Sequence, residues 1–418
     1  MTGVASNVRT ENATVVIIGA GQSGLAMSHC LTSRGIDPVL LERGQVANSW
    51  KNERWDSLRL LTPNWQCTLP GLAYSGDEPD NFMPVADLTG FLDRYAEHID
   101  APIRTDTSVT DVSAGNGGYS LQTSQGPIRA RAVVLASGGF NKPKIPACAS
   151  GVPGHIHQVT PMNYHNPDQL PDGGVLVVGT SATGLQLSEE IHASGRLVTL
   201  AVGEHVRMPR RYRDRDIQWW MDGSGLLDER WDEVDDLTRA RGVPSPQLVG
   251  SPEGRTLDLN TLSDLGVRLT GRLAMVHDGV AMFSGSLQNT CALADLKMNR
   301  MLNTIDGWAS DNGLNDVGTP ERYAATRLPS DPLLKLDLNK GEIATIVWAT
   351  GYNPDYSWLN VPVVDRKGRL KHDGGVVDAP GMYALGLTFL RRRKSSFIHG
   401  AQDDAQDMAT HLADYLAG

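Results

Sequence analysis

Two glycine-rich turns, each directly after a short apolar run, constrain this chain more than any other feature. Residues 19–24 (GAGQSG) follow the β-branched run 15–18, and residues 179–184 (GTSATG) follow the apolar run 175–178. A strand, a tight glycine turn and a helix start form a pyrophosphate site, because glycine lets the backbone approach the ligand and the helix N-terminus offers free N–H groups. Two such turns predict two bound nucleotides, and therefore hydride or electron transfer between them.

An acidic residue supports the first site. A helix at 25–34 and a strand at 38–41 are expected next, and Glu42 stands 42 − 19 = 23 positions after Gly19. That spacing is close to the roughly 20 positions expected for a carboxylate that accepts both hydroxyls of an adenosine ribose. Because a 2′-phosphate would be repelled there, the first site favours FAD or NAD over NADP.

Size, charge and cysteine spacing restrict the class of protein. The 418 residues suit two or three domains, and the net charge of −10 disfavours binding to nucleic acid or to an anionic membrane. No apolar run approaches the ~20 residues needed to span a bilayer, and the N-terminus lacks a signal pattern, so we expect a cytoplasmic protein. The four scattered cysteines predict reduced thiols rather than a metal site or a redox-active disulfide.

The rest of the chain alternates between predicted strands, helices and one long irregular segment. Residues 45–84 are rich in Trp, Pro and Asn, and we expect them to fold over a bound cofactor. A small antiparallel meander is expected at 108–112, 119–123 and 128–130, with a separate buried strand at 132–136. The other predicted elements are helices at 87–98, 185–193, 292–305 and 402–416, and strands at 197–202, near 268–276, and at 280–283, 343–348 and 382–385.

The order of these motifs resembles the flavin-containing monooxygenases, the single-component class that includes the plant YUCCA-type and the Baeyer–Villiger enzymes. The resemblance rests on the first turn with its acid, on Trp50, on 136–138 (ASG), on the second turn and on 349–352 (ATGY). It spans almost the whole chain. It implies an α/β fold with two Rossmann-like domains, in which an NAD(P)-binding domain at 169–335 is inserted into an FAD-binding domain made of 1–168 and 336–418.

The resemblance also implies an activity. Such an enzyme takes a hydride from NADPH or NADH onto FAD and activates O₂ as a flavin C4a-(hydro)peroxide. One oxygen atom then passes to a small organic substrate by N- or S-oxygenation or by Baeyer–Villiger insertion. The alternative is an NAD(P)H-dependent flavoprotein oxidoreductase or oxidase without oxygen insertion, because Thr160 stands where the family has a histidine four residues before an aromatic, here Tyr164. A homo-oligomer is compatible with the sequence.

In this chemistry the cofactor reacts and the protein positions it, so polar side chains near the flavin need only form hydrogen bonds. Asn64 and Gln66 match the family's polar loop and are the candidate catalytic residues, although their place beside Pro63 equally fits ordinary turn residues. The pair His399-Gly400 precedes a helix whose N-terminus we expect to stabilise the negative charge of reduced flavin.

The coenzyme of the second site is left open between NADPH and NADH, with NADPH favoured. Arg207 and Arg210 are expected to bind a 2′-phosphate, because a guanidinium group matches it bidentately. Glu204, just after the second strand, favours NADH, and alternation of the arginines with Asp214 and Asp216 also fits a salt-bridge network. The residues expected to bind cofactors are Gly19, Gly21, Gln22, Ser23, Gly24, Glu42, Arg43, Trp50, Val109, Ser137, Gly138, Gly179, Ser181, Thr183, Gly184, Arg207, Arg210, Thr350, Gly351, Gly400 and Gln402.

Overall fold

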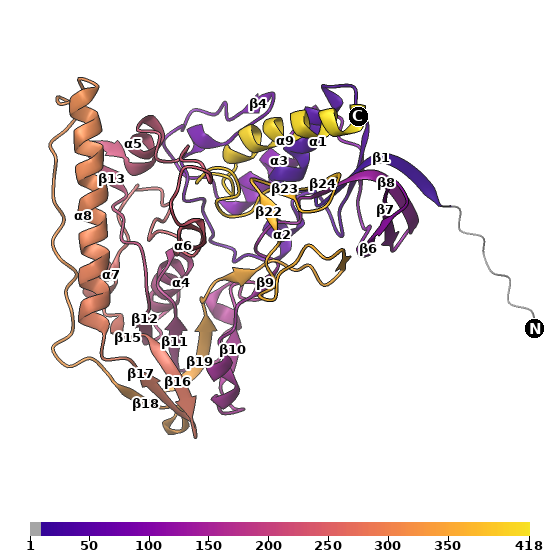
Figure 1. The fold of residues 1–418 in the computed structure, drawn as a ribbon. Coiled ribbons are helices and arrows are strands. Elements are labelled where there is room, and N and C mark those ends of the chain that lie inside the picture. The colour runs from indigo at the N-terminus through magenta and orange to yellow at the C-terminus, as the bar shows by residue number, and fades with distance from the viewer. Residues whose placement is uncertain (1–9) are drawn as a thin grey trace, which may run out of the picture.

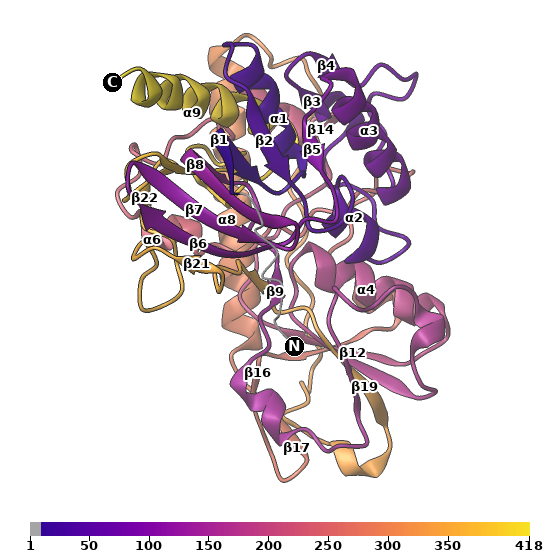
Figure 2. The ribbon, with the colours of Figure 1, turned by 90° about the vertical axis from the view of Figure 1, so that its right-hand side faces the viewer.

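Two sheets with parallel strands at their centres organise residues 10–418, which are the residues that the computed structural model describes (Figures 1 and 2). One sheet lies in the upper part of both views and the other in the lower part. Both are covered by helices or by a further sheet layer, which is why their central strands read as apolar runs. The predicted α/β class with two Rossmann-like units is therefore confirmed.

The first sheet is built around a strand whose last four residues are fully or almost fully buried. Helices α1 (Gln22–Thr32) and α9 (Gly400–Ala417) pack against each other across its surface, and α3 (Val85–His98) contacts α1. Residues from the C-terminal segment thus complete the core of the N-terminal unit. The parallel strands, in order across the sheet, are β24 (Met382–Ala384), β8 (Gly126–Leu135), β1 (Glu11–Ile18), β2 (Pro38–Leu41) and β5 (Ile103–Arg104).

The second sheet repeats the same arrangement. Helices α4 (Ala182–Ala193) and α7 (Leu259–Leu265) pack on one face, and a three-stranded antiparallel sheet covers the other. That small sheet consists of β16 (Leu273–His277), β17 (Val280–Phe283) and β18 (Lys335–Asp337). The parallel strands, in order, are β10 (His157–Val159), β19 (Ile343–Trp348), β11 (Gly174–Val178), β12 (Val198–Val202) and β15 (Arg268–Gly271).

A long helix, α8 (Leu287–Asp311), runs along one side of the molecule beside both parts (Figure 1). It is longer at both ends than the helix expected at 292–305. Its buried stripe packs against Trp220 of α5 (Ile217–Gly223). The remaining short elements are α2 (Asn48–Asn52), α6 (Leu237–Arg241), β3 (Thr68–Leu69), β4 (Leu72–Ala73), β13 (Arg211–Tyr212), β14 (Arg215–Asp216), β21 (Leu359–Asn360), β22 (His372–Asp373) and β23 (Val376–Val377).

The antiparallel meander forms as predicted from β6 (Val109–Gly115), β7 (Gly118–Thr123) and β8, but its last strand is longer than expected. The separate strands expected at 128–130 and 132–136 are wrong, because β8 is continuous. It pairs with β7 through its first half and with β24 through its second half. One strand thereby joins the meander to the parallel sheet.

The chain passes between the two units along two adjacent segments. β9 (Lys142–Pro143) carries it out and pairs antiparallel with β20 (Tyr352–Asn353), which brings it back. The expected boundaries at 168/169 and 335/336 place β10 and β19 in the first unit, whereas both strands pair in the second sheet. This assignment of the two strands is corrected accordingly, and we propose that the crossings lie at β9 and β20.

Residues 45–84 lie between the units rather than over one of them alone. Trp55 and Leu58 from this segment are buried in the core of the second unit, while Leu60 and Cys67 belong to the core of the first. None of the helices within residues 10–418 is long and apolar enough to cross a membrane.

Candidate functional site

The first glycine turn is packed so closely that two of its glycines admit no side chain. A Cβ atom added to Gly19 would lie 2.6 Å from the carbonyl oxygen of Ala136, and one added to Gly24 would lie 1.9 Å from that of Gly19. Gly21, between them, faces space where no atom of residues 10–418 comes within 4 Å of an added Cβ. The turn is closed against the protein and open on the side from which a pyrophosphate would approach.

The first glycine turn, the start of α1 and the carboxylate of Glu42 together form what we call the first cradle. Gly21 is the N-cap of α1, and within the described part of the chain no side chain caps the helix there. The buried carboxylate of Glu42 accepts hydrogen bonds from the backbone N–H groups of Ala20 (2.9 Å) and Gly44 (3.1 Å). A helix N-terminus attracts phosphate, and a fixed carboxylate at the end of the second strand accepts ribose hydroxyls. These residues fit the pyrophosphate and the adenosine of FAD.

The second turn has the same geometry with one change. A Cβ atom added to Gly179 would lie 2.2 Å from the carbonyl oxygen of Ala349, and one added to Gly184 would lie 2.0 Å from that of Gly179. Ser181 takes the middle position and is the N-cap of α4, and no described side chain caps this helix either. Thr183 lies in the first turn of α4. The residues therefore fit a second pyrophosphate.

The polar loop at Asn64 and Gln66 is buried, and much of its hydrogen-bonding capacity is unused. The Asn64 amide nitrogen donates to the backbone oxygen of Glu78 at 2.9 Å. Its Oδ1, and both amide atoms of Gln66, have no partner among residues 10–418. Because a buried polar group without a partner costs about 1–3 kcal/mol, a ligand with matching donors and acceptors is expected to satisfy them. The predicted polar loop is thus a structural fit for a cofactor such as the flavin.

The N-terminus of α9 provides a second group of this kind. His399 is its N-cap, and both ring nitrogens are buried without a partner in the described chain. Burial, helped by nearby Lys394, lowers the pKa of His399 to about 4, so the ring is neutral near pH 7 and offers one donor and one acceptor. α9 also contacts β3, which closely follows Gln66. The sequence predicts a role for the dipole of this helix N-terminus. The structure adds the His399 ring, which can form specific hydrogen bonds with a ligand.

Trp50 stands between the two units. Its indole nitrogen donates to the Gln22 side chain at 3.4 Å, and its ring packs against both hydrophobic cores. The guanidinium of Arg54 lies 5.4 Å from its ring centre and 5.8 Å from that of Tyr352 in β20. The start of α1 is thereby linked to the returning connection between the units.

The other residues expected to bind cofactors lie at strand ends and helix starts. Ser137 and Gly138 follow β8, and the Ser137 carbonyl accepts a hydrogen bond from the Asn141 amide at 2.8 Å. Thr350 and Gly351 follow β19 in the same way, and the Thr350 hydroxyl donates to the carbonyl of Lys144 at 2.5 Å. The others are Ser23, buried in α1; Arg43, paired with Glu53; Val109, half-buried at the start of β6; and Gly400 and Gln402, in the first turn of α9.

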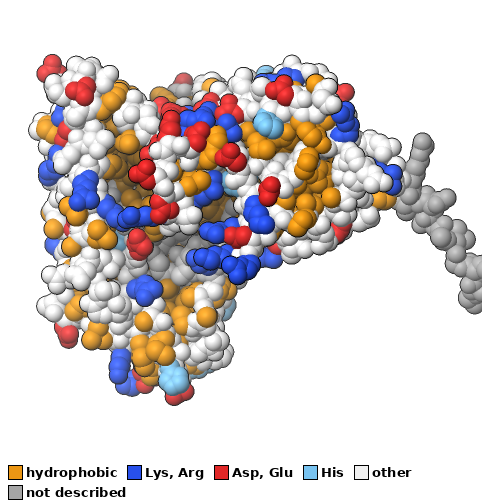
Figure 3. Space-filling model, viewed as in Figure 1, with side chains coloured by type: hydrophobic (Ala, Val, Ile, Leu, Met, Phe, Trp, Pro, Cys, Tyr) orange, Lys and Arg blue, Asp and Glu red, His pale blue; other side chains and the backbone are white. Residues whose placement is uncertain are grey.

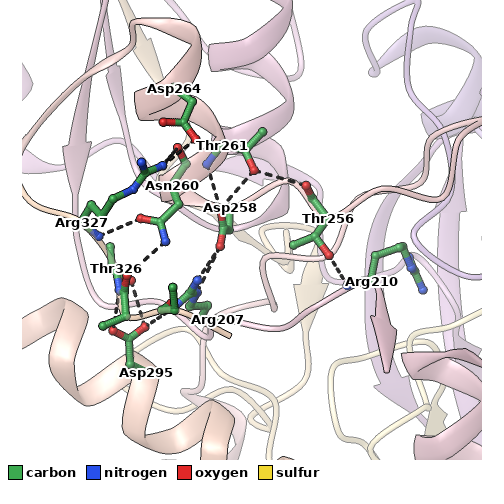
Figure 4. A network of polar contacts seen from close by, with 12 residues as sticks. Arg207, Arg210, Thr256, Asp258, Asn260, Thr261, Asp264, Asp295, Thr326 and Arg327 are labelled. Atoms are coloured by element: carbon green, nitrogen blue, oxygen red, sulfur yellow. Dashed lines mark hydrogen bonds and ion pairs between the residues drawn. The ribbon is translucent and has the colours of Figure 1, made fainter. Parts of the chain in front are cut away.

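Arg207 is not available for a phosphate. Its side chain is only 5% exposed, and its guanidinium bonds Asp258 (2.7 Å), Asp295 (2.7 Å) and the carbonyl of Ala324 (2.8 Å), as Figure 4 shows for the two carboxylates. A buried guanidinium needs such partners, because charge without compensation is costly in the interior. Arg207 therefore belongs to a salt-bridge network, as the alternative interpretation of the sequence expects, although the network is buried rather than exposed to solvent.

Arg210 is likewise internal and points away from Arg207 (Figure 4). Its guanidinium bonds Asp216 at 2.5 Å and the carbonyl of Leu61 at 2.7 Å, and it lies 4.5 Å from the ring centre of Phe82. Leu61 and Phe82 belong to the segment between the units. The residue therefore fastens that segment to the second unit, and the expected 2′-phosphate contact is corrected for both arginines.

The surface is hollowed between the upper and lower parts, and Lys and Arg side chains gather along the hollow (Figure 3). A pocket of about 370 Å³ reaches the polar loop from outside. Its lining includes Asn64 together with two arginines, Arg59 and Arg94, and two acids, Glu78 and Asp87. Such a lining suits a small polar molecule.

Sequence reasoning did not single out Trp55, whose indole nitrogen is buried without an acceptor among residues 10–418. Its place in the same aromatic-rich loop as Trp50 was the available signal. The four cysteines are free thiols, as predicted. Residues 10–418 contain no group of three or more His, Cys, Asp or Glu side chains that could hold a metal ion.

Comparison with known sequences finds that the chain is similar to oxidoreductases. Residues 16–221 match the family described as pyridine nucleotide-disulphide oxidoreductase. An uncharacterized oxidoreductase CzcO-like of Geobacillus kaustophilus is 28% identical over 404 residues, covering 96% of this chain and 98% of that protein. Indole-3-pyruvate monooxygenase YUCCA6 of Arabidopsis thaliana is 32% identical over 212 residues, covering 47% of this chain and 49% of that protein.

Solved structures share the fold over nearly the full length. The flavin-containing monooxygenase of Stenotrophomonas maltophilia has a TM-score of 0.65 at 18% identity, covering 97% of this chain and 99% of that one. The bacillithiol disulfide reductase of Bacillus cereus has a TM-score of 0.62 at 15% identity, with the same coverage. Both are similar in the arrangement of two dinucleotide-binding units.

Proposed function

The chain belongs to the flavin-containing monooxygenase family and is a flavin-dependent oxidoreductase, and we propose that it inserts one oxygen atom of O₂ into a small organic substrate. The proposed electron donor is a reduced nicotinamide dinucleotide. The proposed reaction is N- or S-oxygenation or Baeyer–Villiger insertion.

The observation that carries the proposal is the pair of matched cradles. In each, no side chain can be added to the first or last glycine, no described side chain caps the helix start, and the turn after β8 or β19 packs on the first glycine. The middle position is open at Gly21 and is taken by Ser181 in the second cradle. The two units are joined by adjacent connections, so they stay close to each other. Two dinucleotides held in this way support hydride transfer from one to the other.

FAD, when bound, supplies the hydride acceptor and the reaction with O₂. The protein's part is to bind, orient and exclude water. We propose that the Gln66 amide and the neutral His399 ring satisfy the polar edge of the flavin, since the Gln66 amide atoms and both His399 ring nitrogens are buried and lack other partners among residues 10–418. The N-terminus of α9 would favour negative charge there. Trp50 and Trp55 would keep water from the site by filling the space between the units.

The alternative, a flavoprotein oxidoreductase without oxygen insertion, is favoured by Thr160 at the family's histidine position. A dithiol form of that chemistry finds no support in the cysteines. Burial raises the pKa of Cys67 to about 12 and the pKa values of Cys30 and Cys291 to about 11, which keeps these thiols protonated and poorly reactive. The alternative that remains is an oxidase, or a reductase for another acceptor, and the test must distinguish it from a monooxygenase.

The test uses the FAD-loaded enzyme, reduced anaerobically by NADH or NADPH and then mixed rapidly with O₂. We expect a transient near-ultraviolet absorbance before the oxidised flavin spectrum returns, and an oxygenated product from a panel of amines, sulfides, ketones and aromatic acids. Product formation is scored rather than coenzyme consumption, because uncoupled turnover also consumes coenzyme. Direct return of the oxidised spectrum, with no product from any substrate, would refute oxygenation and leave the alternative.

A further inference from the structure

The pocket of about 370 Å³ beside the polar loop is lined by charged side chains of both signs. Arg59 and Arg94 supply two positive charges, and Glu78 and Asp87 supply two negative charges. None of these four side chains forms an ion pair with another residue of the described chain, 10–418. A ligand that itself carries both signs would find a partner for each of its charges here.

Two polar side chains of this pocket are held in place by hydrogen bonds to the backbone. The Arg59 guanidinium donates to the carbonyl of Phe82 at 2.8 Å. The Asn64 amide nitrogen donates to the carbonyl of Glu78 at 2.9 Å. Asn64 is 5% exposed, and its Oδ1 has no donor within residues 10–418. Neither proposed flavin contact uses this oxygen. A buried acceptor without a donor favours a ligand that brings an N–H group, and an ammonium group has three.

The apolar wall of the pocket is held in place by contacts with the rest of the protein. Phe82 is 3% exposed, and the Arg210 guanidinium lies 4.5 Å from its ring centre. Met83, the next residue of the wall, is 5% exposed, and its carbonyl accepts a hydrogen bond from the backbone N–H of Leu60 at 2.9 Å. Because this wall is ordered before a ligand arrives, binding costs little further conformational entropy.

We propose that this pocket binds the head group of an α-amino acid, with the two arginines at its carboxylate and the two acids and Asn64 Oδ1 at its ammonium group. This inference rests on the proposed function and names the substrate class of that function. A guanidinium group matches a carboxylate bidentately, and an ammonium group pairs with carboxylates as a compact charge. Asn64 belongs to the same short 3₁₀ helix as Gln66, which connects the pocket to the proposed flavin contact.

The same contacts decide which atom of the amino acid can react. An ammonium nitrogen has no lone pair, so the head group cannot accept an oxygen atom while the acids hold it. A thioether sulfur in the side chain keeps its lone pairs and is a soft nucleophile, so we expect a thioether amino acid and S-oxygenation. One atom of O₂ forms the S–O bond, the O–O bond breaks, and the other atom leaves as water. The reduced nicotinamide dinucleotide supplies two electrons as a hydride, and solvent supplies one proton.

The first measurement is calorimetric titration of the oxidised, FAD-loaded enzyme with L-methionine as the probe. N-acetyl-L-methionine lacks the ammonium group and L-methionine methyl ester lacks the carboxylate, and we expect each to bind at least 10-fold more weakly. Arg94→Gln and Asp87→Asn should each weaken L-methionine binding at least 5-fold. Arg94→Gln should also narrow the difference between L-methionine and its ester. Glu97→Gln is the matched control, because Glu97 is exposed on α3 and is not part of the pocket lining.

The second measurement compares the products from L-methionine and from thioanisole, a sulfide without a head group, under O₂ with NADH or NADPH. We expect methionine sulfoxide to form with a kcat/KM at least 10-fold above that for thioanisole. Equal binding of L-methionine and its two derivatives would overturn the inference, and so would equal effects of Asp87→Asn and Glu97→Gln. Oxygenation of thioanisole but not of L-methionine would also overturn it and leave the proposed function standing. No oxygenated product from any sulfide, amine or ketone would refute the proposed function itself.

Discussion

Replacing Arg207 with methionine tests whether this arginine is a structural cation or a phosphate ligand. Methionine keeps most of the side-chain length but leaves Asp258 and Asp295 without their shared positive charge. Breaking a buried ion pair by removing one partner costs about 3–5 kcal/mol. The lower end applies here, because both acids keep other donors: Asp258 accepts from the Thr261 backbone at 2.9 Å, and Asp295 accepts from the Thr326 backbone at 2.8 Å. We expect a loss of about 3 kcal/mol.

The assay is urea denaturation of the FAD-loaded enzyme, accompanied by calorimetric titration with NADP⁺. Arg211→Met is the control, because Arg211 is exposed and its guanidinium donates, among residues 10–418, to the carbonyl of Asp214 at 2.8 Å and to no carboxylate. Its free energy of unfolding should change by less than about 0.5 kcal/mol. If Arg207→Met keeps wild-type stability but binds NADP⁺ much more weakly, then Arg207 contacts the phosphate and the argument from burial is wrong.

Three further predictions concern the flavin cradle. Gly21→Ala should change the free energy of unfolding of the apoprotein by less than about 0.5 kcal/mol but weaken FAD binding at least 10-fold. Gly24→Ala should destabilise the apoprotein by about 1–3 kcal/mol, because its Cβ would lie 1.9 Å from a backbone oxygen. Urea denaturation and FAD titration distinguish the two variants. Gln66→Leu should stabilise or leave unchanged the apoprotein, since it removes two buried atoms without partners among residues 10–418, and should weaken FAD binding in the same titration. Because the pKa of His399 is lowered to about 4, the unfolded chain binds more protons than the folded protein between pH 4 and 6.5. The free energy of unfolding of the wild type should therefore fall as the pH decreases through that window, and His399→Phe should lose less stability there. Urea denaturation at several pH values measures both. An equal pH dependence in both proteins would contradict the burial of His399.

Features set by neighbouring residues were predictable from the sequence. The strands β2 and β19 have the predicted bounds, because each is a short, mostly apolar run that ends at a polar residue or shortly before a glycine turn. The two turns and the acid at Glu42 follow from spacing along the chain. The sequence does not distinguish a cofactor-binding role of Asn64 and Gln66 from an ordinary turn, because no local pattern reveals that a polar side chain is buried without a partner.

Features set by distant contacts were not predictable. β10 and β19 join the second sheet through pairing with strands far along the chain, and no composition change marks that choice. The carboxylates that bind Arg207 lie 51 and 88 positions away in the sequence. The alternating charges near Arg207 therefore predict an exposed surface, whereas in the fold this arginine belongs to a buried network. Charged residues that look solvated in sequence therefore need their partners before a role in binding is assigned.

The two cradles have the same backbone arrangement but differ in the groups that would control how long a ligand stays bound. In the first, Glu42 is buried and fixed by two backbone N–H groups, and the C-terminal segment closes over α1 so tightly that a Cβ on Gly386 would lie 2.6 Å from Ser23 Oγ. In the second, the strand registers place Val202 at the position of Glu42, and Ser181 brings a side chain to the middle position. A resident cofactor gains from the first arrangement, because preorganised and enclosed groups slow its release. A coenzyme that must leave after each hydride transfer gains from the second, because fewer fixed groups hold it and its release is faster.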